Sequence, residues 1–296
     1  MTNLVTAADL GTPSRPSLEE IVDLDRYPIQ RLDSPLRAEV VAEAREELDA
    51  FGCFRLSDFI RPEMIATMLA EAEQLRDRTF WAADSHNPYA SKPDPELAAS
   101  HPRNTFQDRK SGFINSDLLS QHSPLNAIYD NNVMTHFVWD CLGTERPIYQ
   151  WADPLGRNPY GVMDTDHYFP WHFDGNEFTV SILVQKAESG GVFEYVPDIR
   201  RPGEENYEHV RHILEGGRDD IRELDLLPGD LQLFKGRFSM HRVTRIVGDT
   251  TRYIALPTYV HDPWRMNRPH HSISYYGRAT DLHYARELTL SDGLTD

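Results

Sequence analysis

The sequence contains very few cysteines and no long apolar run. Cys53 and Cys141 are the only two cysteines among 296 residues, too few for the disulfide framework of a small secreted domain. No stretch approaches the roughly 20 consecutive apolar residues of a membrane-spanning helix, and the first residues do not resemble a signal peptide. We therefore expect a protein of the reducing cytoplasm.

Basic residues are also scarce. The 30 lysines and arginines are outnumbered by 47 aspartates and glutamates, which gives a formal net charge of −17 and a pI near 5.1. Such a charge argues against a nucleic acid or an anionic membrane as partner, and its simplest role is solubility. An apolar fraction of 40% is ordinary for a globular protein, and this length fits one large domain.

The chain divides into segments of different character. Residues 1–20 mix small and polar types without periodicity and predict a loose tail before a single domain at 21–296. Ser34-Pro35 marks a helix start and Gly52 the end of that helix. The expected segments are helical support at 34–79, a lid-like stretch at 80–121, a helix at 124–142, a barrel core at about 147–260 and a C-terminal segment at 261–296.

A His-x-Asp pair, His172 and Asp174, precedes an apolar and β-branched run at 179–185. In an extended chain the two side chains point to the same face, about 6.6 Å apart along the strand. Imidazole and carboxylate together suit iron(II) or a similar divalent cation. Singly, such residues are more often a core histidine and a turn aspartate, so the pair requires support from its surroundings.

That support lies downstream. A strand, a Pro-Gly-Asp turn and a second strand are predicted over residues 226–234, and the next predicted strand carries His241. His172, Asp174 and His241 would form a two-histidine, one-carboxylate triad, which leaves positions on iron open for a chelating co-substrate and oxygen. A further strand begins at Arg252, whose guanidinium could bind a carboxylate through two hydrogen bonds. Arg242 and Arg245 are rivals for that role.

These motifs resemble the Fe(II)/2-oxoglutarate-dependent oxygenases. Residues 171–178 (Trp-His-Phe-Asp-Gly-Asn-Glu-Phe) and 190–197 (Gly-Gly-Val-Phe-Glu-Tyr-Val-Pro) are similar to a bacterial branch of free-amino-acid hydroxylases and radical halogenases. The resemblance covers roughly residues 20–280. It implies a mostly β fold with flanking helices, built as a double-stranded β-helix (a jelly-roll, cupin-like barrel). It also implies iron(II), 2-oxoglutarate and molecular oxygen as cofactor and co-substrates.

The activity implied is hydroxylation of a free amino acid or a derivative, with decarboxylation of 2-oxoglutarate to succinate. Arg109, Thr258 and Trp264 are the candidate substrate contacts. The carboxylate at Asp174 favours hydroxylation, because the resembling halogenases have a small non-ligating residue at that position. Alternatives are a desaturase or cyclase with the same cofactors, or a non-catalytic metal-binding barrel. Ile254 stands where other branches often have a hydroxyl, which leaves open the second partner of the 2-oxoglutarate carboxylate.

Overall fold

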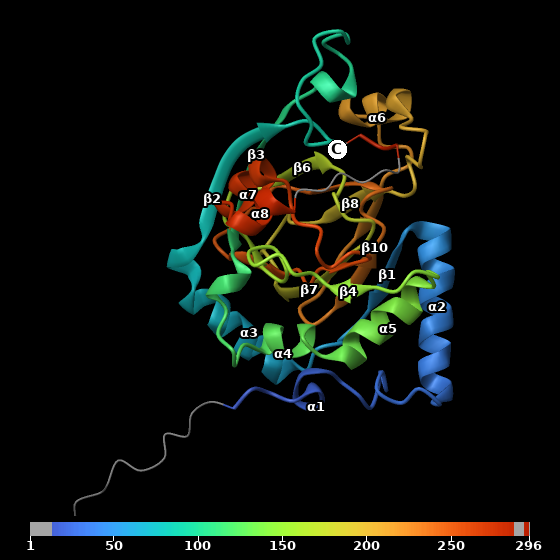
Figure 1. The fold of residues 1–296 in the computed structure, drawn as a ribbon, viewed down its shortest axis with the longest axis vertical. Coiled ribbons are helices and arrows are strands. Elements are labelled where there is room, and N and C mark those ends of the chain that lie inside the picture. The colour runs from blue at the N-terminus through green and yellow to red at the C-terminus, as the bar shows by residue number, and fades with distance from the viewer. Residues whose placement is uncertain (1–13, 287–292, 296) are drawn as a thin grey trace, which may run out of the picture.

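A computed structural model describes residues 14–286 and 293–295 and shows two main antiparallel sheets with helices around them (Figure 1). The seven-stranded sheet contains, in spatial order, β1 (Cys53–Leu56), β10 (Leu231–Phe234), β7 (Thr179–Gln185), β12 (Arg252–Ala255), β5 (Tyr160–Met163), β3 (Gln107–Ile114) and β2 (Phe80–His86). The four-stranded sheet contains β6 (Phe169–His172), β11 (Met240–Val243), β8 (Phe193–Val196) and β9 (Arg222–Leu224). A short pair is formed by β4 (Tyr149–Gln150) and β13 (Tyr259–Val260).

The chain alternates between the two large sheets from β5 onward. Strands β5, β7, β10 and β12 belong to the seven-stranded sheet, whereas β6, the consecutive pair β8 and β9, and β11 lie between them in sequence and belong to the other. This alternation is the topology of a jelly roll, and every paired strand is antiparallel to its neighbour. The expected fold class, mostly β with flanking helices and a jelly-roll core, is confirmed.

Helices cover the outer side of the seven-stranded sheet (Figure 1). They are α2 (Pro35–Phe51), α3 (Pro62–Gln74), α4 (Pro124–Tyr129) and α5 (Asn132–Leu142), with a short 3-10 turn η1 (Arg76–Arg78) after α3. As predicted, Ser34 caps α2, Pro35 opens it, and Gly52 ends it in the left-handed region at φ 68°. The single helix expected over 124–142 is two helices, because Asn131 caps a new start by accepting from the backbone N–H of Val133.

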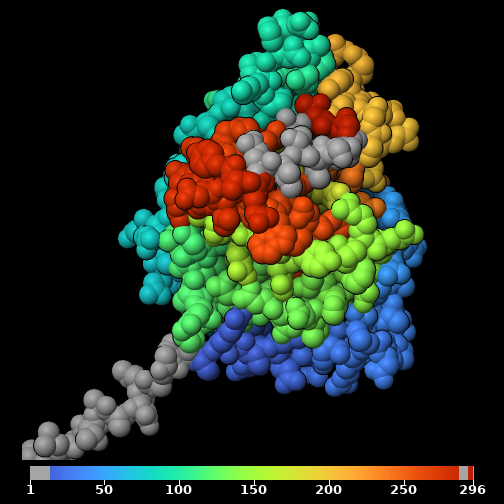
Figure 2. Space-filling model, viewed as in Figure 1, coloured from blue at the N-terminus to red at the C-terminus, as the bar shows by residue number. Residues whose placement is uncertain are grey.

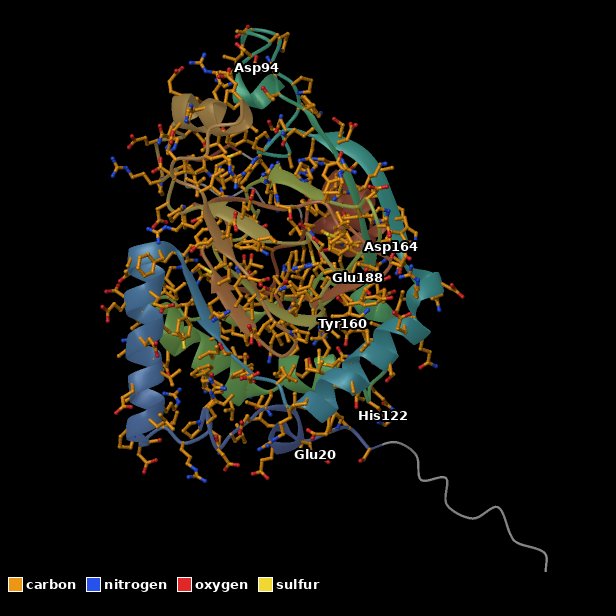
Figure 3. All side chains as sticks on the ribbon, turned by 180° about the vertical axis from the view of Figure 1, so that it is seen from behind. Glu20, Asp94, His122, Tyr160, Asp164 and Glu188 are labelled. Carbon is orange, nitrogen blue, oxygen red and sulfur yellow. The ribbon has the colours of Figure 1, made fainter. Side chains whose placement is uncertain are left out.

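The segment 80–121 differs from the expected aperiodic lid. Strands β2 and β3 pair over seven positions and extend the large sheet, and only residues 87–106 project from it, with the 3-10 turn η2 (Pro102–Asn104). In Figure 3, Asp94 marks the tip of this projection, at the opposite end of the molecule from Glu20. A second 3-10 turn, η3 (Ser116–Leu118), follows β3.

The ends of the chain also pack more closely than expected. Within the predicted tail, residues 1–13 lie outside the described part, but α1 (Leu18–Ile21) has a complete capping box and Arg15 pairs with Asp130. At the other end, α7 (Pro269–Tyr276) and α8 (Asp281–Ala285) cover the middle of the face seen in Figure 2. Helix α6 (Tyr207–Leu214) lies beside the 87–106 projection. None of the described helices is long and apolar enough to cross a membrane.

Candidate metal centre and co-substrate site

Two strands of the four-stranded sheet bring the predicted metal ligands together. His172 ends β6 and lies directly opposite His241 of β11, and Asp174 follows β6 by two residues. Oδ1 of Asp174 is 3.7 Å from Nε2 of His172 and 3.5 Å from Nε2 of His241. Among the described residues this is the only group of three metal-ligating side chains close enough to share one ion. The three atoms can therefore occupy one face of a single divalent cation.

Backbone carbonyls orient both imidazoles. Nδ1–H of His172 donates to the carbonyl of Pro170 over 2.8 Å, and Nδ1–H of His241 donates to the carbonyl of Ser239 over 3.0 Å. Each Nε2 is then the unprotonated nitrogen that a metal requires. Burial also lowers the pKa of His172 well below its ordinary value, so this ring is neutral at physiological pH.

Asp174 is held with one oxygen toward the histidines. Its backbone N–H donates to the carbonyl of Gly236 over 3.0 Å, and its Oδ2 accepts from the Thr179 hydroxyl over 2.5 Å. Oδ1 is left to face the two rings. Burial alone would raise the pKa of this carboxyl, but the neighbouring histidines and Thr179 outweigh burial and hold the pKa below its usual range. The side chain is therefore an ionised ligand and does not turn away into the Gly175-Asn176 bend.

A cavity of about 280 Å³ lies beside the three metal-ligating side chains, which form part of its wall. Its walls come from both main sheets and from α7, and they are largely apolar: Phe113, Met163, Phe169, Phe193, Phe234 and Tyr276. Arg252 of β12 lines the same cavity and is 3% exposed. Burial lowers the pKa of its guanidinium to about 10, so the group is still charged at neutral pH.

No carboxylate of the described chain neutralises Arg252. Within residues 14–286 and 293–295 its guanidinium makes neither a hydrogen bond nor an ion pair, although it is almost fully buried. A buried charge without a partner is costly, which fits a site whose partner is a bound anion. Two imidazoles, one carboxylate and an uncompensated arginine across an open cavity fit iron(II) and 2-oxoglutarate.

The two rival arginines lie elsewhere. Arg245 is beyond the end of β11, which stops at Val243, and its guanidinium sits half-exposed over the ring of Tyr168. Arg242 pairs with Glu194 at 2.5 Å and lies over the ring of Trp171. Because β11 stops at Val243, Arg245 does not continue the strand that carries His241, which separates it from Arg252.

Of the three candidate substrate contacts, one lines the cavity and two do not. Thr258 lines the cavity, and its hydroxyl donates to the carbonyls of Gly156 and Leu256. Arg109 is fully buried, pairs with Asp84 at 2.9 Å and lies over the ring of Tyr275, outside the cavity lining. Its guanidinium is paired with Asp84, and a contact between Arg109 and the substrate stays a prediction. Trp264 is more than half exposed under the guanidinium of Arg286 and does not line the cavity either.

Several residues at the cavity were not among the predicted substrate contacts. His271 and Tyr275 both face the cavity from α7, and their spacing of four residues is the helical signal that could have revealed them. Arg265 donates to the Gly175 carbonyl over 3.2 Å and to Oδ1 of Asn176 over 2.5 Å, which fixes the turn after Asp174. No pattern in the sequence indicated that contact.

Comparison with known protein families identifies the family of the chain. A sequence model of the family described as "HalD: Halogenase D" matches residues 36–272. The chain belongs to the Halogenase D family. No curated protein sequence matches this family member significantly.

Solved structures with a similar fold share little sequence with this Halogenase D family member. AviO1 from Streptomyces viridochromogenes Tue57 is 15% identical, with 77% of this chain and 95% of that chain covered and a TM-score of 0.52. A 2OG-Fe(II) oxygenase family oxidoreductase from Burkholderia pseudomallei is 15% identical over 75% of this chain and 91% of its own, with a TM-score of 0.48. A Pseudomonas putida prolyl-4-hydroxylase is 10% identical over 73% and 96%, with a TM-score of 0.46. The likeness to AviO1 concerns the fold.

Family and site together make this Halogenase D family member an Fe(II)/2-oxoglutarate-dependent oxygenase. His172, Asp174 and His241 would hold the iron, and Arg252 would hold the distal carboxylate of 2-oxoglutarate. Bound together, the iron and the keto acid would supply oxygen-dependent oxidation of a C–H bond, coupled to loss of CO2 from the keto acid to give succinate. The chain itself supplies orientation, a buried counter-charge and apolar walls that exclude water.

Proposed function

We propose that the protein hydroxylates a small, amino-acid-like molecule. The observation that carries the proposal is the position of the Asp174 carboxylate, 3.5 Å and 3.7 Å from the Nε2 atoms of the two histidines. In the radical halogenases that the sequence resembles, this position holds a small residue and chloride takes the vacated site on iron. Here a carboxylate fills that site, and its negative charge disfavours a second anion on the same ion.

The surroundings of Asp174 strengthen the choice of hydroxylation over halogenation. Thr179 and Gly236 each contact the residue, one at the carboxylate and one at the backbone, so the ligating position is built into the fold. Membership of the Halogenase D family does not by itself decide between hydroxylation and halogenation. The side chain at position 174 determines whether a halide can reach the iron.

The size of the cavity supports a small substrate. The volume of about 280 Å³ has to contain 2-oxoglutarate as well as the part of the substrate that is oxidised. Its mixture of aromatic walls with Thr258, His271 and Asn267 suits a molecule that has an apolar chain and polar ends. A free amino acid or a small derivative matches that description.

The test is substrate-triggered succinate release. The iron-loaded protein is incubated with 2-oxoglutarate, oxygen, high chloride and one member at a time of a panel of free amino acids and small conjugates. We expect succinate only with the true substrate, whose mass increases by one oxygen atom. A chlorinated product would overturn the assignment of Asp174, and a product lacking two hydrogens would indicate the desaturase or cyclase. Absence of succinate with every compound would favour a non-catalytic metal-binding barrel.

A further inference from the structure

The carboxylate bound by Arg252 requires more hydrogen bonds than one guanidinium supplies. A carboxylate has about four lone-pair sites, and an arginine fork satisfies two of them. Two residues along β12 the side chain is Ile254, which also lines the cavity and has no donor. In a buried, largely apolar cavity the remaining lone pairs need a donor from another strand.

Ser111, on β3, lines the cavity, and its hydroxyl has no hydrogen-bond partner among the described residues. Its side chain is 1% exposed, and its Oγ makes no hydrogen bond within the part of the chain that the structure describes. Leaving a buried hydroxyl unpaired is unfavourable, so such a group in a folded protein calls for an explanation. A hydrogen bond to something bound in the cavity explains it.

The sheet register places Ser111 on the same row as Arg252. Arg252 lies opposite Met163 on β5, and the pairing of Val162 with Gly112 puts Met163 opposite Ser111 on β3. Residues opposite one another on neighbouring strands point to the same face, and all three line the cavity. Two strand spacings separate the Cα atoms by about 10 Å, which the arginine side chain and a carboxylate together can bridge.

Three other hydroxyls of the cavity wall are already hydrogen-bonded to the protein. Thr179 donates to Asp174, Ser181 donates to Gln232 over 2.9 Å, and Thr258 donates to two backbone carbonyls. Tyr89, also buried without a partner, stacks on Phe173 in a different cluster, on the side of the four-stranded sheet. Of these hydroxyls, Ser111 is the one that is both unpaired and on the row of Arg252.

We propose that the Ser111 hydroxyl donates a hydrogen bond to the distal carboxylate of 2-oxoglutarate and so replaces the donor that Ile254 removes from β12. The proposal rests on the 2-oxoglutarate site assigned above. Its consequence is selectivity: Ser111 and Arg252 together favour a keto acid that has a second carboxylate over one that ends in a methyl group.

The experiment measures binding and not turnover. Anaerobic, Fe(II)-loaded wild type and Ser111→Ala are titrated calorimetrically with 2-oxoglutarate and, by direct titration or competition, with 2-oxopentanoate, which has a methyl group in place of the distal carboxylate. We expect Ser111→Ala to weaken 2-oxoglutarate about tenfold, because the lost hydrogen bond is to a charged acceptor, and to leave 2-oxopentanoate unchanged. Ser111→Thr should restore much of the discrimination, since it retains the hydroxyl.

Two controls separate this role from a structural one. Ser181→Ala removes a cavity hydroxyl that is already paired, and it should leave the ratio of the two affinities unchanged. The ligand-free Ser111→Ala protein should melt at the wild-type temperature or above, because an unpaired buried hydroxyl has been removed. Equal weakening of both keto acids, or no weakening of either, would overturn the proposal. A wild-type protein that binds neither keto acid would instead overturn the 2-oxoglutarate site itself.

Discussion

A Cβ atom on Gly236 would lie 2.0 Å from Oδ2 of the Asp174 carboxylate. The backbone of residue 236 therefore passes directly against the metal ligand, and its carbonyl accepts from the Asp174 N–H. Gly236 does not have a positive φ, so its backbone conformation suits any residue and the side chain alone is excluded. The position of the carboxylate depends on the absence of a methyl group at residue 236, in the connection between β10 and β11.

Gly236→Ala should therefore impair metal binding with little effect on the fold. We expect a loss of about 10- to 100-fold in affinity for Fe(II) or Mn(II), the range found when a contact behind a metal ligand is disturbed. Calorimetric titration under anaerobic conditions measures it. Gly175→Ala is the matched control, because a Cβ there meets nothing within 4 Å. Equal affinities in the two variants would show that Asp174 can move without penalty.

Arg252→Ala should raise the concentration of 2-oxoglutarate needed for half-maximal binding by roughly 30-fold or more. The reason is that truncating one partner of a buried, hydrogen-bonded charge pair costs about 2 kcal/mol or more. Affinity for the metal should change little, because Arg252 belongs to the other sheet. Arg245→Ala serves as control, since that guanidinium is half-exposed over Tyr168. A larger effect from Arg245→Ala would reassign the co-substrate arginine.

A buried contact between His283 and Asp153 helps to hold the C-terminal helix α8 in place. Nε2–H of His283 donates to Oδ2 of Asp153 over 3.0 Å, and both side chains are fully buried. Replacement His283→Ala removes one donor from this buried carboxylate, which keeps the N–H groups of Leu155 and Gly156, so we expect a loss of about 1–3 kcal/mol in the free energy of unfolding. Urea denaturation measures it against His212→Ala, an exposed histidine beside Asp219. A loss below about 1 kcal/mol would mean that α8 docks independently of this contact.

The metal-free protein should lose stability as the pH falls through about 6.5. Burial lowers the pKa of both His86 and His172, so the folded state takes up fewer protons there than the unfolded chain. Stability then rises with pH across this window and falls on acidification. Urea midpoints at pH 5.5 and 7.5 measure the slope. His86→Gln should reduce this pH dependence of the urea midpoint, and the exposed His136→Gln should not. The same pH dependence in the wild type and both variants would contradict a contribution from His86.

The triad could be predicted from sequence because its members obey simple spacing. His172 and Asp174 are two residues apart at the end of a strand, and His241 follows a recognisable Pro-Gly-Asp turn. Arg252 was predictable in the same way, since it opens the strand after a Gly-Asp turn. What decides between Arg252 and Arg245 is where β11 ends, and the length of a four-residue strand is set by its neighbours and not by its own sequence.

The β2–β3 hairpin was missed because its inner face is polar. Strand β3 places Arg109, Ser111 and Phe113 on the buried side, where an ordinary half-buried strand would have three apolar residues. The alternation that identifies a strand is therefore absent, although the backbone pairs normally. Arg109 and Ser111 are tolerated there because one meets Asp84 and the other faces the cavity. A strand that builds a site can lack the pattern that predicts strands.

The two ends of the co-substrate site belong to different sheets. The metal ligands come from the four-stranded sheet and the loop after β6, whereas Arg252 and Ser111 come from the seven-stranded sheet. A dianion that is bound at both ends therefore links the two sheets of the jelly roll for as long as it stays bound. By mass action, a hundredfold excess of such a ligand over its Kd adds about 2.7 kcal/mol to the stability of the folded chain. The concentration of the keto acid would then set part of the resistance of the protein to unfolding and proteolysis.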